Sequence, residues 1–196
     1  LFAAGNESSD DIVYPAAYGP VVTISAMAPD WKKAYYTNRG DWIDLMAPGG
    51  DIHYPGGQIY STSVQVEKDS DTGEIVKAVS HYEYMQGTSM ACPHASGVAA
   101  LIVSHLGGKG FTNEMCKKNL LTALRPSNID EYNVGYEGIL GFGYLDAARA
   151  LDVDMKKAPA PINKVNCETG YTHLTLSFPA VSDEDDRTAT YYTIYY

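Results

Sequence analysis

Hydrophobic and polar residues are arranged along this chain in two patterns, one that predicts strands and one that predicts helices. Continuous runs of β-branched and apolar residues are typical of buried strands. The predicted strands are a strand end in residues 1–6, then 21–26, 43–49 and 59–62. Small and apolar residues in longer runs, bounded by caps or proline, predict helices. The predicted helices are residues 89–105, 112–124 and 144–151.

A β-hairpin is predicted over residues 64–85. The runs 64–68 and 74–79 alternate between apolar and polar residues, and Asp69-Ser70-Asp71-Thr72-Gly73 joins them. Aspartate, serine and glycine in such a linker favour a turn. The linker also has part of the pattern of a calcium loop, but Gly73 takes a ligand position, so we do not expect calcium there. The hairpin directly precedes a candidate nucleophile, and we expect it to border the substrate cleft.

The composition changes near residue 152. Residues 1–152 read as one domain, 153–161 as a proline-stiffened linker, and 162–196 as an incomplete β segment. Within that segment, residues 174–178 alternate as a half-buried strand, and 191–196 predict another.

The most informative stretch is Gly87-Thr88-Ser89-Met90-Ala91-Cys92-Pro93-His94. Gly87 suits a sharp turn, and Ser89 lies at the start of a helix that continues through the apolar run 95–103. A serine there has two possible roles. It caps the helix through its hydroxyl, or it acts as a nucleophile beside the free amides of the first turn. Residue types alone favour the cap.

This stretch resembles the nucleophile segment of the subtilases, the subtilisin-like serine proteases, and Ala3-Ala4-Gly5-Asn6 resembles their oxyanion-hole strand end. The resemblance implies an α/β fold, a partial subtilisin-like parallel sheet with flanking helices. It implies peptide-bond hydrolysis through an acyl-enzyme on Ser89, with Asn6 and the Ser89 amide stabilising the oxyanion. It also assigns substrate contacts to small residues around the site. These residues are Ala3, Ala4, Gly5, Gly87 and Thr88.

The subtilase resemblance also implies that the catalytic aspartate and histidine precede Asn6, because the triad order in subtilisin is Asp, His, Ser. We therefore expect both in an upstream part of the same parent chain, and we expect this fragment to be inactive alone. Five histidines are present, and none is expected to be the base. They are His53, His81, His94, His105 and His173. His94 follows Ser89 by five residues, an offset of about 140° around a helix.

Bulk properties exclude some functions. The net charge of −10 argues against nucleic acid as a partner. No membrane span is predicted, because the sequence contains no run of about 18 apolar residues. The acidic run 182–186 is expected to be a solvated loop, with a cation site as the alternative. The three cysteines have no metal-site spacing, and we expect no disulfide framework. Polypeptide substrates, no cofactor for catalysis, and a secreted or cell-envelope location follow from the subtilase resemblance. A structural calcium ion is possible, but the sequence does not locate one.

The segment 162–196 resembles the first strands of a fibronectin type III module, and Phe178 replaces the usual tryptophan. Two other functions stay open. The parent may be a pseudoprotease that keeps the fold and binds or inhibits, or the chain is an interaction scaffold. An α/β-hydrolase esterase is disfavoured because its serine precedes its acid and histidine.

Overall fold

The computed structural model describes residues 1–125, 129–151, 166–169 and 174–177. By internal contacts the chain divides into two compact units, Leu1–Leu151 and Asp152–Tyr196. Each unit is described by itself below.

A three-stranded parallel sheet forms the centre of the first unit. Its strands are β1 (Phe2–Ala3), β2 (Thr23–Met27) and β3 (Leu45–Pro48), in the order β1-β2-β3. Nearly every residue of β2 and β3 is buried. This agrees with the continuous apolar runs that predicted them, because parallel sheets are covered on both faces.

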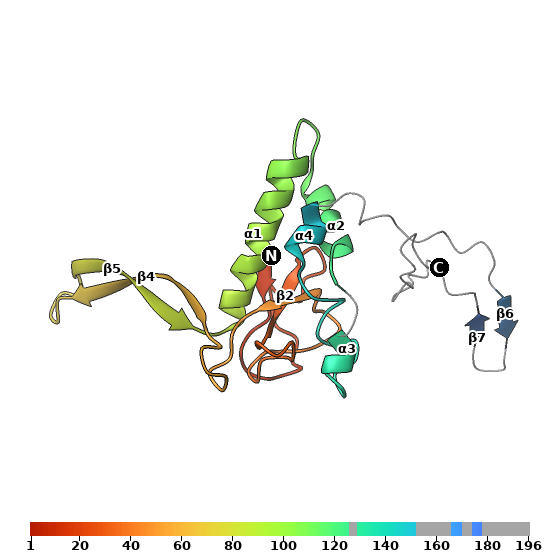
Figure 1. Cartoon of the computed structure of the whole chain (residues 1–196), viewed down its shortest axis with the longest axis horizontal. Coiled ribbons are helices and arrows are strands. Elements are labelled where there is room, and N and C mark those ends of the chain that lie inside the picture. Colours follow the sequence, from red (N-terminus) through yellow and green to blue (C-terminus); the bar gives the residue numbers. More distant parts are fainter. Residues whose placement is uncertain (126–128, 152–165, 170–173, 178–196) are drawn as a thin grey trace. The chain divides into compact units, whose positions relative to one another are not determined.

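Helix α1 (Thr88–Leu106) packs against β2 and β3 and begins one residue before its predicted start (Figure 1). Its buried face carries Ala91, Ala95, Val98 and Ile102, which recur at helical spacing. The alanine side chains are short, so this helix lies close to the sheet and forms the main core with it. The first turn of α1 is thereby fixed to the sheet.

The other two predicted helices of the first unit are shorter than expected. Helix α2 (Asn113–Thr122) starts where expected, and Thr112 caps it by accepting from Met115 N. Helix α3 (Ile129–Tyr132) was not predicted. Helix α4 (Ala147–Leu151) starts three residues late, because the Tyr144 backbone instead bridges to Met46 and Arg125.

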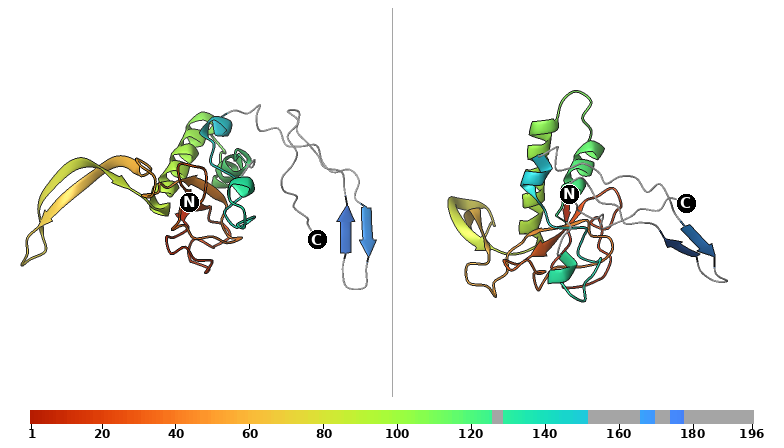
Figure 2. Two further views of the ribbon diagram at one scale, coloured as in Figure 1. Left: turned by 60° about the horizontal axis from the view of Figure 1, so that its bottom comes forward. Right: turned by 45° about the vertical axis from the view of Figure 1, so that its right-hand side comes forward.

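The long hairpin consists of β4 (Ile59–Lys68) and β5 (Ile75–Met85), paired antiparallel from Ile59↔Met85 onwards. It extends away from the sheet and α1 (Figure 2). Residues 59–62 form a strand as predicted, and they continue into the hairpin as the first part of β4. At the tip, Asp69 Oδ1 accepts from Asp71 N, Thr72 N and Thr72 Oγ1. These bonds lower the pKa of Asp69, with Thr72 N contributing most, and they close the turn.

The described part of the second unit is one antiparallel pair, β6 (Asn166–Thr169) with β7 (Leu174–Ser177). Strand β7 lies within the predicted strand 174–178, and β6 was not predicted. The linker 153–161, the acidic run 182–186 and the predicted strand 191–196 lie outside the described residues. Within the described part of the chain, no helix combines the length and the apolar character that crossing a membrane requires.

Candidate active site

Ser89 occupies the second position of α1, directly after the turn at Gly87 and Thr88. The N-cap residue is Gly87, and Ser89 makes no capping hydrogen bond. The Ser89 side chain is exposed and has no hydrogen bond to any described residue. The capping role that residue types favoured is therefore wrong. The hydroxyl is left available for chemistry.

Asn6 is joined to the same turn across 82 residues of sequence. Thr88 N and Thr88 Oγ1 each donate to Asn6 Oδ1 at 2.9 Å. Thr88 Oγ1 in turn accepts from Gly5 N at 3.1 Å. Because a backbone N–H only donates, the atom facing Thr88 N must be the amide oxygen of Asn6. The Asn6 Nδ2 donors are consequently directed away from Thr88.

Two unused donors converge beside Gly87. Gly87 has φ 146° and ψ 162°, and its absent Cβ would lie 3.5 Å from Asn6 Nδ2, 3.6 Å from Asn6 Oδ1 and 3.7 Å from Ser89 N. Neither of those nitrogens donates a hydrogen bond to a described residue, and a first-turn amide has no partner within its own helix. Two fixed donors in this arrangement are what a developing oxyanion requires. The geometry therefore places the predicted Asn6 and Ser89 groups together.

A cavity of about 360 Å³ opens beside these donors. Ala3, Gly5 and Thr88 line it together with Asn6 and Ser89. Two of the predicted substrate-binding residues lie elsewhere. Ala4 is fully buried and accepts from Asn38 Nδ2, and Gly87 is buried in the turn itself.

The turn is held from behind by residues that the sequence analysis did not identify. Gly87 N donates to Tyr36 Oη at 2.9 Å and to Gly49 O at 3.0 Å. The Tyr36 hydroxyl is buried between Gly49 O and Gly50 O, and burial raises its pKa far above the usual range. The two contacts of Gly87 N join residues more than 35 positions apart, and those of the Tyr36 hydroxyl span 13 and 14 positions, so no local pattern in the sequence reveals them.

Gln86 fastens the chain between the hairpin and the nucleophile turn. Its Oε1 accepts from Ile52 N at 2.6 Å, and its Nε2 donates to Tyr35 Oη at 2.7 Å. The base of β5 is thereby tied to two loops of the core. Gln86 was also missed by the sequence analysis.

None of the histidines that the structure describes contacts the Ser89 hydroxyl. His94 Nδ1 donates to Met90 O at 2.8 Å, and His81 Nε2 lies 3.6 Å from Glu83 Oε2. His53 Nδ1 lies 2.9 Å from Asp51 Oδ1, an Asp–His pair that the sequence analysis did not anticipate. His105 is in the last turn of α1, and His173 is outside the described residues.

In the described ranges, no group of three or more histidine, cysteine, aspartate or glutamate side chains is arranged to hold a metal ion. Cys92 and Cys116 are both free thiols. Cys92 follows Ser89 by three positions, and burial raises the pKa of its thiol. The neutral thiol is a poor nucleophile.

Comparison with known proteins identifies similar chains. A sequence model of the subtilase family matches residues 1–143. Halolysin of Haloferax mediterranei is 34% identical over 154 residues, covering 78% of this chain and 24% of halolysin. The extracellular basic protease of Dichelobacter nodosus is 32% identical over 153 residues, covering 78% of this chain and 23% of that protease. The chain thus spans about a quarter of the length of these relatives.

The fold comparison agrees with the sequence comparison. A solved protease structure from Pseudoalteromonas arctica matches with a TM-score of 0.60 and 30% identity. The match covers 76% of this chain and 40% of that protease.

Proposed function

The chain belongs to the subtilase family, and on that premise we propose that it is the nucleophile-bearing part of a serine endopeptidase. Ser89 is the nucleophile, and Asn6 Nδ2 and Ser89 N form the oxyanion hole. The observation that carries the proposal is the convergence of these two unused donors beside Gly87.

In the proposed reaction, Ser89 Oγ attacks the carbonyl carbon of a polypeptide substrate. The serine proton passes to a base, and the carbonyl oxygen becomes an anion between Asn6 Nδ2 and Ser89 N. The C–N bond then breaks, the amine takes up the proton, and an acyl ester on Ser89 remains. Water hydrolyses that ester and regenerates the hydroxyl. No metal or organic cofactor is needed for these steps, and a structural calcium ion stays a possibility that no described residue locates.

The base and its orienting carboxylate are proposed to come from a part of the parent chain upstream of Asn6. This follows the subtilase order Asp, His, Ser, and it is consistent with the lack of any contact between a described histidine and Ser89 Oγ. Residues 1–196 alone are accordingly proposed to be nearly inactive, because loss of the base in subtilisin costs roughly a millionfold in turnover. A pseudoprotease parent without those residues is the alternative.

We propose a secreted or cell-envelope location, supported by relatives whose names describe extracellular proteases. For the second unit we propose the beginning of a fibronectin type III-like module, supported by its sequence resemblance and by the antiparallel pair β6–β7. If that module is the working part, the chain is a binding scaffold. Expression of a complete second unit, followed by a partner-binding assay, tests this possibility.

The main test is covalent labelling with a fluorophosphonate probe, read by intact mass. We expect the full-length protein to take one label at Ser89, the Ser89→Ala variant to take none, and residues 1–196 alone to take none. Absence of label on a folded full-length protein would refute the hydrolase and favour the pseudoprotease.

A further inference from the structure

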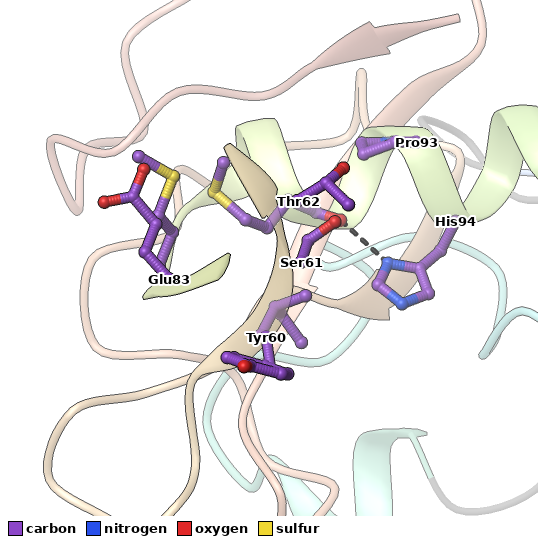
Figure 3. A pocket seen from close by; sticks show the side chains of 9 residues that line it. Tyr60, Ser61, Thr62, Glu83, Pro93 and His94 are labelled. Atoms are coloured by element: carbon purple, nitrogen blue, oxygen red, sulfur yellow. Dashed lines mark hydrogen bonds between the residues drawn. The ribbon is translucent and has the colours of Figure 1, made fainter. Parts of the chain in front are cut away.

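A second cavity of about 360 Å³ lies between the base of the hairpin and the first two turns of α1 (Figure 3). The hairpin residues that line it are Ile59, Tyr60, Ser61, Thr62, Glu83 and Met85. Met90, Pro93 and His94 line it from the helix. We call this cavity the hairpin groove. It shares no lining residue with the cavity beside Asn6.

The hairpin groove begins next to the nucleophile. Met90 directly follows Ser89, and Pro93 lies one helical turn beyond Ser89 on the same face of α1. Ser89 therefore stands between two separate cavities. An extended peptide advances about 3.3 Å per residue, so a chain that crosses Ser89 reaches both cavities within a few residues.

The oxyanion hole fixes the direction in which the substrate runs. The residue whose carbonyl is attacked places its oxygen near Asn6 Nδ2, so its side chain lies beside the cavity of Ala3, Gly5 and Thr88. The peptide on the other side of the scissile bond must then leave towards the hairpin groove. This groove is consequently the place for the leaving-group residues of the substrate.

Strand register determines which hairpin side chains face α1. Ser61 pairs with Glu83 and Ile59 pairs with Met85, so these four share one face of the hairpin. The opposite face carries Tyr60 and Tyr84, whose rings lie 4.6 Å apart. The groove is lined by Ser61, Glu83 and Met85 from the first face, and Tyr60 and Thr62 of β4 line it as well.

The chemistry of the groove suits a long cationic side chain. Glu83 is its only acidic lining residue, and no lysine or arginine lines it. The Glu83 carboxylate is 37% exposed and is bound by Ser63 Oγ and approached by His81. Met85 and Met90 offer flexible apolar walls that suit a methylene stem.

We propose that the hairpin groove binds the leaving-group side of polypeptide substrates and selects lysine or arginine there through Glu83. The selected residue lies among the first three after the scissile bond. The inference rests on the proposed function, since it assigns specificity to the same site. In this proposal the hairpin contributes to substrate specificity.

The test uses the full-length protein and fluorogenic peptides that differ only after the scissile bond. Each of the first three leaving-group positions carries lysine, norleucine or glutamate in turn. We expect kcat/KM to be about fivefold higher for lysine than for norleucine at one position, and lower for glutamate, as a partly exposed ion pair predicts. The Glu83→Gln variant should lose this preference, and Glu83→Lys should reverse it in favour of glutamate.

Glu67→Gln is the matched control, because Glu67 lies on the same face of β4, near the tip, and pairs only with Lys77 at 3.9 Å. It should keep the lysine preference. Fluorophosphonate labelling of Ser89 shows whether each variant has an assembled site. Cleavage without a lysine preference, or a preference that survives in Glu83→Gln, overturns the inference but not the proposed function. If the wild-type protein neither cleaves nor takes the label, both fall.

Discussion

Thr88 holds Asn6 by two hydrogen bonds of 2.9 Å, one from its amide and one from its hydroxyl, both to Asn6 Oδ1. The helix that carries Ser89 thus orients the side chain that we propose to complete the oxyanion hole. Thr88 positions this donor, which follows β1 in the sequence, and the next residue is the proposed nucleophile.

Asn6→Ala should lower turnover by roughly 100- to 1000-fold with little change in KM, because it removes a donor used mainly in the transition state. Steady-state kinetics on the full-length protein measures this. Asn6→Asp keeps the acceptor for Thr88 but has no Nδ2 donor, so we expect a loss at least as large. An unchanged rate in both variants would exclude Asn6 from the oxyanion hole.

Thr88→Val should reduce kcat/KM by about tenfold and destabilise the fold by about 1–3 kcal/mol. The substitution removes the hydroxyl that binds Asn6 Oδ1 and leaves Gly5 N without its acceptor in a buried turn. Thr88→Ser restores the hydroxyl and should recover most of both losses. Kinetics and urea unfolding of the two variants check this, and equal behaviour of Val and Ser would contradict the role of the hydroxyl.

Gly87→Ala should reduce fluorophosphonate labelling of Ser89 far more than any loss of stability explains. A methyl group there lies 3.5 Å from Asn6 Nδ2 and 3.7 Å from Ser89 N, in the space that we propose for the oxyanion. The backbone φ of 146° adds strain, on the order of 1–2 kcal/mol for a residue with a side chain. Gly97→Ala is the control. Gly97 lies in α1 with nothing within 4 Å of the added carbon, so labelling should persist and stability should rise by up to about 1 kcal/mol.

Tyr144 should make stability fall at alkaline pH. Its buried hydroxyl donates to Trp31 O. Burial raises the pKa of this hydroxyl to about 12, from the ordinary tyrosine value of 10.0. Below pH 10 both folded and unfolded states keep the proton, so this contribution is fully present. As pH rises from 10 towards 12, only the unfolded state ionises, and stability falls by about 1.4 kcal/mol per pH unit.

Tyr144→Phe is expected to be less stable than wild type by about 1 kcal/mol at pH 8, because it loses the hydrogen bond to Trp31 O. Its stability should fall less steeply above pH 10, so the two curves converge. Urea unfolding at pH 8, 10 and 11 measures both effects. Tyr18→Phe is the control, because Tyr18 is 59% exposed and should not alter the slope. Parallel curves for wild type and Tyr144→Phe would contradict the assignment.

The sequence predicted the elements that depend on local pattern and missed the contacts that depend on topology. Helix α1 was found nearly to its ends, because small and apolar residues recur at helical spacing from Ala91 to Ile102. Ser89 and Asn6 were identified through short motifs with rare residue types. Strand 59–62 was predicted apart from the hairpin 64–85 but belongs to its first strand, since alternation shows that a segment is extended but not which strand it pairs with.

The supports of the site could not be predicted in this way. Tyr36 reaches Gly87 across 51 residues, and Asn38 binds Ala4 O across 34. Tyr36 and Asn38 are both buried, and each bonds to a backbone atom that lies nearby only in the folded chain. Helix α4 was placed too early for the same reason. Tyr144 has the sequence environment of a helix start, but its backbone pairs with Arg125 and Met46.

Gln86 separates two parts of the chain that are adjacent in sequence, the end of the hairpin and the nucleophile turn. It is anchored to Ile52 N and Tyr35 Oη, and Gly87 N is anchored immediately after it. The hairpin is therefore anchored at its base, immediately before the turn at Gly87. A hairpin anchored in this way can change in length and sequence during evolution while the turn that carries Ser89 keeps its geometry, which makes the hairpin an exchangeable element of the fold.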